Sequence, residues 1–139
     1  MKVKDVMHKG VVWVEPKTPI STIARKMRKE DIGAVPVGEN DRLVGMVTDR
    51  DICCRGVGNA KDPKKLTARD VMTKKIVYCN ADQDVKSAIA LMKKAKVRRL
   101  PVINVRKRMV GILSLGDISS RSTRATSGVA LKAVAAHHA

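Results

Sequence analysis

Hydrophobic and polar positions follow two periods along the chain, and the same order of periods occurs twice. Apolar residues with the i, i+3, i+4, i+7 spacing of one buried helix face occur at 20–27 and at 85–92. A short run rich in β-branched residues precedes each helix, at 11–14 and at 76–79. Two more apolar runs follow each helix, and then a short second helix that starts at a hydroxyl residue and an aspartate. Each half therefore predicts the order β-α-β-β-α.

The two strands after each helix are predicted to form a hairpin. Residues 34–37 and 43–47 flank the sequence Gly-Glu-Asn-Asp, whose residue types favour a tight turn. Residues 99–103 and 109–113 flank the basic sequence Asn-Val-Arg-Lys-Arg, which is less typical of a turn. The second copy gains its one extra residue in this turn.

The residues themselves repeat along with the elements. The tripeptide Asp-Val-Met at 5–7 recurs at 70–72, and the pair Val44-Gly45 recurs at 110–111. We therefore divide the chain into a first repeat at 1–56, a linker at 57–69, a second repeat at 70–122 and a tail at 123–139. The tail is expected to end in a short Ala-rich helix from about Val129. A unit of about 50 residues buries little core alone, so the two repeats are expected to pack together.

Composition narrows the class of protein. The chain has 139 residues, of which 44% are hydrophobic and 1% aromatic, so Val, Ile, Leu, Met and Ala must build the core. No apolar run approaches the roughly 20 residues of a membrane span, and the N-terminus lacks the apolar region of a signal peptide. We expect a cytoplasmic protein with no membrane partner.

Cysteine and histidine spacing argues against a metal site. Cys53, Cys54 and Cys79 fit neither a disulfide framework nor a CxxC motif. His8 and the pair at 137–138 have no ligand-like spacing with other residues. No triad, metal cluster or phosphate-binding GxxxxGK[ST] loop is visible in the sequence, so we expect no enzyme activity and no required cofactor.

The charge indicates an anionic partner. Twenty-nine Lys and Arg oppose 13 Asp and Glu, for a net charge of +16. Such an excess favours nucleic acid or phosphorylated small molecules as partners. A well-solvated basic surface is the alternative interpretation.

A hydroxyl and an aspartate stand three residues apart after the third strand of each repeat. They are Thr48 with Asp51, and Ser114 with Asp117. A hydroxyl at a helix start can donate to a phosphate, whose charge the free N–H groups there also favour. A carboxylate one turn later can accept bonds from ribose hydroxyls. Alternatively, the same residues only cap a helix; both roles can coexist.

These features together resemble a tandem pair of cystathionine-β-synthase (CBS) domains, known as a Bateman module. The matching stretches are the two Asp-Val-Met tripeptides, "IGAVPV" with "VRRLPV", and "GMVTDRD" with "GILSLGD". The resemblance covers residues 1 to about 122 and implies an α/β (α+β) fold of two β-α-β-β-α repeats packed as a CBS pair. With no enzyme or channel domain attached, the chain resembles a stand-alone CBS-domain protein.

The resemblance implies a non-catalytic regulatory module that binds AMP, ADP or ATP in the cleft between the repeats. S-adenosylmethionine, NAD-type nucleotides and cyclic dinucleotides remain alternatives. The adenine is expected against the first and second strands of each repeat, although core packing is the alternative for each apolar member. These positions are Val11, Val12, Val14, Ile32, Gly33, Ala34 and Val35, and Ile76, Val77, Cys79, Val97, Arg98, Arg99 and Leu100.

The resemblance also implies unequal sites, since phosphates bound at one repeat reach the second-strand start of the other. A nucleotide held by Thr48 and Asp51 is expected to meet Arg98 and Arg99, with Arg50 nearby. One held at Ser114 and Asp117 meets only the neutral Gly33 and Ala34, and Gly116 replaces Arg50. One charge-assisted bond to phosphate would separate the affinities about tenfold.

Two other functions remain open: a basic nucleic-acid-binding or stress-associated protein, and a module that regulates an unidentified protein partner. Against the first, single-strand binders usually stack bases on aromatic residues, and only Trp13 and Tyr78 are available. The family commonly joins two CBS pairs, so we expect a homodimer. Candidates for its surface are Met27, Ile52, Met92 and Ile118.

Overall fold

The computed structural model describes residues 1–10, 12–40, 42–59 and 62–135. Val11, expected to contact the ligand, and the histidines at 137–138 lie outside the described residues. The described chain divides into two units. We call residues 12–76 the Thr48 unit, and residues 1–10 with 77–135 the Ser114 unit.

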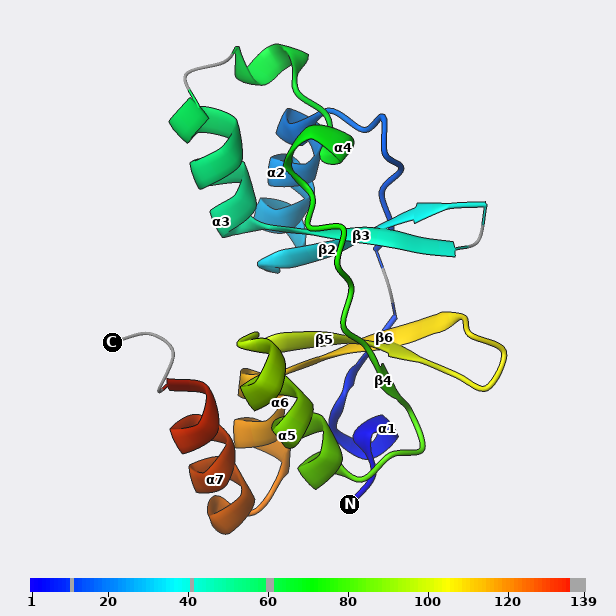
Figure 1. The fold of residues 1–139 in the computed structure, drawn as a ribbon, viewed down its shortest axis with the longest axis vertical. Coiled ribbons are helices and arrows are strands. Elements are labelled where there is room, and N and C mark those ends of the chain that lie inside the picture. Colours follow the sequence, from blue (N-terminus) through cyan, green and yellow to red (C-terminus); the bar gives the residue numbers. More distant parts are fainter. Residues whose placement is uncertain (11, 41, 60–61, 136–139) are drawn as a thin grey trace. The chain divides into compact units, whose positions relative to one another are not determined.

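The Ser114 unit is a four-stranded sheet with helices on one side (Figure 1). The strand order is β1-β6-β5-β4, in which β4 runs parallel to β5 and the other pairs are antiparallel. Its elements are α1 (Val3–Val6), β1 (His8–Lys9), β4 (Cys79–Asn80), α5 (Val85–Ala95), β5 (Arg99–Ile103), β6 (Met109–Ser114), α6 (Leu115–Arg121) and α7 (Arg124–Ala135).

The Thr48 unit repeats this plan around the antiparallel hairpin β2–β3. Isolated bridges join Val14 to Val37 in parallel and Met46 to Thr73 antiparallel, at the positions that β4 and β1 occupy in the other unit. Its elements are α2 (Ile20–Glu30), β2 (Ala34–Glu39), β3 (Arg42–Thr48), α3 (Asp49–Asp51), a π-helix (Ile52–Gly56), 3-10 turns (Val57–Asn59, Pro63–Lys65) and α4 (Ala68–Val71).

The two Asp-Val-Met segments are exchanged between the repeats. The first segment lies on α1, whose Val3 amide donates to Gln83 O at 2.8 Å, within the second repeat. The second lies on α4, whose Ala68 amide donates to Thr18 O at 2.8 Å, within the first. Each unit therefore contains the hairpin of one repeat and the Asp-Val-Met helix of the other.

Each unit has its own apolar core. In the Ser114 unit, α7 adds Ala130 and Val134, both at most 1% exposed, so the tail forms a longer helix than expected and packs on the core. The fully buried larger side chains of the two cores are Ile23, Val35, Val37, Val47 and Val71, and Val3, Val6, Val85, Met92, Leu100, Leu113 and Ile118.

The residues predicted to form the dimer surface were wrongly chosen. Met92 and Ile118 are 0% exposed and Met27 is 8% exposed, because all three face the core of their own unit. Of the four candidates, only Ile52 is partly exposed. The 3.6-residue period that suggested an apolar face marked the interior rather than an interface. Among the described residues, no helix is long and apolar enough to cross a membrane.

The three cysteines have different surroundings. Cys79 lies on β4, is 1% exposed, and burial raises its pKa to about 11. Cys53 and Cys54 are exposed on the π-helix. Because the thiolate is the reactive form of cysteine, only the exposed pair should react in the folded protein.

We expect 5,5′-dithiobis(2-nitrobenzoate) at pH 8 to label two thiols of the native protein rapidly and the third only after unfolding. The thiolate of Cys79 is then about one part in a thousand, and its sulfur is covered. A Cys79→Ala variant should keep the fast phase unchanged and lose the slow one. Fast labelling of three thiols in the native protein would contradict this assignment.

Candidate functional site

In each repeat, the register of the hairpin places the start of its first strand beside the hydroxyl–aspartate motif that follows its second strand. In the Thr48 unit, Ala34 pairs with Thr48, and the Asp49 amide donates to Gly33 O at 3.0 Å. In the Ser114 unit, Arg99 pairs with Ser114, and the Leu115 amide donates to Arg98 O at 3.0 Å. The backbone therefore brings together the strand start and the hydroxyl in both copies.

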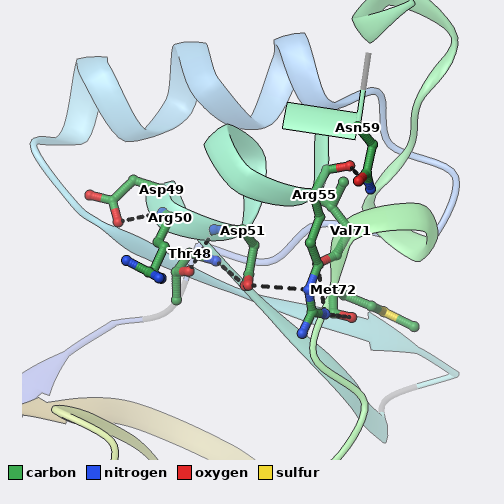
Figure 2. A network of polar contacts seen from close by, with 8 residues as sticks. All are labelled: Thr48, Asp49, Arg50, Asp51, Arg55, Asn59, Val71 and Met72. Atoms are coloured by element: carbon green, nitrogen blue, oxygen red, sulfur yellow. Dashed lines mark hydrogen bonds and ion pairs between the residues drawn. The ribbon is translucent and has the colours of Figure 1, made fainter. Parts of the chain in front are cut away.

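Thr48 and Asp51 form a reciprocal cap at the start of α3. The Thr48 amide donates to Asp51 Oδ2 at 2.9 Å, and the Asp51 amide donates to Thr48 Oγ1 at 3.1 Å (Figure 2). Two helix-start amides are thereby satisfied. The Asp51 side chain is 13% exposed, so the cap fixes its carboxylate in a partly buried position.

Ser114 and Asp117 form the same cap at the start of α6, with one more bond. The Ser114 amide donates to Asp117 Oδ2 at 2.9 Å, and the Asp117 amide donates to Ser114 Oγ at 3.1 Å. In addition, Ser114 Oγ donates to Asp117 Oδ2 at 2.9 Å. Within the described residues no such hydroxyl bond joins Thr48 to Asp51, so the two caps differ in this one contact.

The capping interpretation of both motifs is thus confirmed, and it does not exclude a ligand. Each cap occupies Oδ2 of its aspartate and leaves Oδ1 for other partners. A carboxylate offers about four acceptor positions. The arrangement can therefore hold a helix start and still accept hydroxyl donors from a bound molecule.

The remaining predicted residues are divided between the units. Arg50 is exposed beside Asp51, and Val12 lies partly buried in the same unit. Arg98 is exposed and Val77 packs against the core of the Ser114 unit. The expected approach of Arg98 and Arg99 to a nucleotide at Thr48 joins residues of different units, and it stays a prediction.

The glycine of each motif is a packing residue, which the sequence alone did not reveal. A Cβ on Gly111 would lie 2.5 Å from the backbone oxygen of His8, on the exchanged strand β1. A Cβ on Gly45 would lie 2.5 Å from Met72 Sδ, on the exchanged segment after α4. The glycine is needed because the exchanged segment runs closely beside the third strand.

A duplicated arginine was also missed. Arg55 follows Asp51 by four residues and donates from Nη1 to Met72 O at 3.1 Å (Figure 2). Arg121 follows Asp117 by four residues and donates from Nη1 to Met7 O at 3.0 Å. The 66-residue shift that relates the motifs also relates these arginines, so comparing the two repeats residue by residue up to their ends would have found them.

A profile of the CBS domain family matches residues 3–55 and 68–123. The chain therefore belongs to the CBS-domain family, as a tandem pair of repeats. Hypoxic response protein 1 of Mycobacterium tuberculosis is 38% identical over 117 residues, covering 84% of this chain and 81% of that protein. The CBS domain-containing protein YhcV of Bacillus subtilis is 36% identical, covering 84% and 82%.

Solved structures of CBS proteins share the fold. A crystal structure of Hypoxic Response Protein I with two coordinated zinc ions has a TM-score of 0.79 at 36% identity, covering 88% of this chain and 100% of that one. A CBS domain pair in complex with 5-methylthioadenosine and S-adenosyl-L-methionine has a TM-score of 0.77 at 27% identity, covering 86% and 94%. CBS pairs are regulatory modules, and this neighbour binds adenosyl ligands.

The described residues provide no counterpart to the zinc sites of that relative. The described ranges contain no group of three or more His, Cys, Asp or Glu side chains placed to hold a metal ion. Cys53 and Cys54 are exposed and adjacent, and no acidic or histidine cluster completes them there.

We expect Gly111→Ala to destabilise the protein by about 1–3 kcal/mol, because the new methyl group meets backbone that cannot move alone. Gly45→Ala, the matched change in the other repeat, should cost less, because Met72 is a flexible side chain. Urea unfolding followed by circular dichroism measures both. Equal losses, or a larger loss for Gly45→Ala, would show that contact with the paired segment does not set the requirement for glycine.

Proposed function

We propose that this protein is a non-catalytic regulatory module that binds adenine nucleotides of the AMP, ADP or ATP class. The observation that carries the proposal is the duplicated hydroxyl–aspartate arrangement, with the same cap geometry at the end of the third strand in both repeats. Thr48 or Ser114 would contact a phosphate, and Asp51 or Asp117 would accept ribose hydroxyls. Gly33 and Ala34, with Val12 and Val77, would line the adenine.

The adenosyl complex of a CBS neighbour supports this ligand class, since adenosine is the part common to S-adenosylmethionine and adenine nucleotides. The excess of positive charge supports a phosphorylated ligand over a neutral nucleoside. S-adenosylmethionine carries a cationic sulfonium, so the two classes differ in charge and can be separated by direct titration.

The two proposed sites differ in the residues next to their hydroxyl–aspartate motifs. Arg50 is adjacent to Asp51, whereas Gly116 takes the corresponding place beside Asp117. In this proposal the Thr48 hydroxyl would donate to the phosphate, whereas that of Ser114 donates to Asp117. Both differences favour tighter binding of a phosphorylated ligand at Thr48 and Asp51.

Isothermal titration with AMP, ADP, ATP and S-adenosylmethionine tests the proposal. At least one adenine nucleotide should bind, and Asp51→Ala should remove the tighter event because ribose loses its acceptor. Asp117→Ala should leave that event largely intact. Each charge-assisted bond is worth about 1.5–3 kcal/mol, so the loss at the mutated site should exceed tenfold.

Because both aspartates cap helices, Asp51→Asn and Asp117→Asn accompany the alanine variants, since Asn keeps an acceptor for the cap amide. Circular dichroism of all four checks that the fold is retained. No binding at millimolar nucleotide would remove the proposal. Equal losses from the two alanine variants would reject the inequality alone.

The proposal places the module in the cytoplasm, where adenine nucleotides are made and consumed, and three free cysteines suit that reducing compartment. The bound nucleotide would act on a protein partner, because we propose no reaction for this chain itself. Recognition of that partner would depend on surfaces that respond to the ligand state.

We further propose that the module is a homodimer. Val129 and Leu131 on α7 are 61% and 58% exposed, and Val57 is 60% exposed, so apolar surface remains for a second copy. Light scattering at micromolar concentration should give a mass about twice the 15.2 kDa of the chain. A clean monomer across that range would overturn the proposal.

A further inference from the structure

Arg55 touches both the proposed ribose acceptor and the exchanged helix α4. Its Nη1 donates to Met72 O at 3.1 Å and to Val71 O at 3.4 Å. Its Nε lies 4.0 Å from Asp51 Oδ1, the carboxylate oxygen that the Thr48 cap leaves available. Figure 2 shows the guanidinium between the Asp51 carboxylate and these two carbonyls.

The carbonyls that Arg55 binds need a partner from outside the helix. α4 has only four residues, and the last carbonyl groups of a helix find no N–H donor within the helix itself. Val71 is 0% exposed and Met72 is 7% exposed, so this helix end leads directly into the core. A basic side chain at a helix C-terminus satisfies such carbonyls and suits the helix dipole.

The second repeat provides an internal comparison. Arg121 donates to Met7 O, at the end of α1, so each unit has one arginine holding the end of its exchanged helix. In the described structure Arg121 forms no ion pair with Asp117, whereas Arg55 faces Asp51. The hold on the helix is therefore duplicated, and the connection to the motif aspartate is present in the first repeat only.

We propose that Arg55 is a positioning residue that couples the Asp51 carboxylate to the end of α4. The functional meaning of this coupling rests on the proposed nucleotide binding at Asp51. Asp51 restricts the rotamers of Arg55, so that less side-chain entropy remains to be lost when the guanidinium binds the α4 carbonyls. A ribose that fixes Asp51 further would hold α4 more firmly.

The coupling gives the two repeats different roles. Occupation of the Thr48 site would be transmitted to residues 68–73, which lie at the end of the linker and the start of the second repeat. Occupation of the Ser114 site would have no equivalent route to α1. The pair is half exposed on the arginine side, and exposed pairs are weak, so the effect should be two- to fivefold in opening equilibria.

Hydrogen–deuterium exchange without ligand tests the coupling through a double-mutant cycle of Asp51→Asn and Arg55→Gln. The probes are the amides of Met72 and Thr73, which donate to Ala68 O and Met46 O, each at 2.8 Å. Asp51→Asn should speed their exchange about two- to fivefold when Arg55 is present. The same change should have no further effect in the Arg55→Gln variant. Asp117→Asn, the matched control, should leave the Met7 amide unchanged.

The same measurement with ATP extends the test to the site. ATP should slow exchange at residues 68–73, and Arg55→Gln should abolish that slowing while ATP still binds by titration. Unchanged exchange in ligand-free Asp51→Asn, or an equal effect with and without Arg55, would overturn the coupling. Failure of ATP to bind would instead count against the proposed function, and the ligand-free cycle would still decide the coupling.

Discussion

The close antiparallel pairing of the exchanged Asp-Val-Met segments with the third strands is the constraint on which the rest of the structure depends. Each hairpin leaves one sheet edge and one apolar face incomplete, and the other repeat's segment supplies both. Met46 and Thr73 exchange two backbone bonds at 2.8 and 3.1 Å, which fixes this contact in the Thr48 unit. Neither repeat is a self-contained folding unit in sequence, although each unit is complete in space.

This constraint explains why structural and chemical requirements are combined in one short motif. The motif glycine lets the exchanged segment approach the third strand, and the hydroxyl and aspartate cap the helix start. The arginine four residues after the aspartate binds the end of the exchanged helix. A group that is already fixed for structural reasons loses little freedom on meeting a ligand. The cap and the proposed binding role therefore support each other.

The sequence predicted the hairpins, the main helices and the caps, because hydrophobic periods and local hydroxyl–aspartate spacing are local signals. The predicted first strands were too long: among the described residues the first is reduced to a bridge at Val14, and the second to β4 at Cys79–Asn80. The hairpins and the main helices occur where the patterns placed them. The segment exchange could not be predicted, because α1 and α4 have similar sequences and fit either sheet by local criteria. Met92 and Ile118 were misassigned to a surface for a related reason: an apolar helix face does not say what covers it.

The exchange of segments also orders events during synthesis of the chain. Residues 12–76 contain every strand and helix of the Thr48 unit, so this unit can close while later residues are still being added. Val3 and Val6 at the N-terminus have no partner until the residues of the second repeat emerge, among them Gln83, whose carbonyl accepts from Val3. Val3 and Val6 precede the whole Thr48 unit in the chain but are buried only after it has closed, and a chain that stops after the first repeat leaves them exposed.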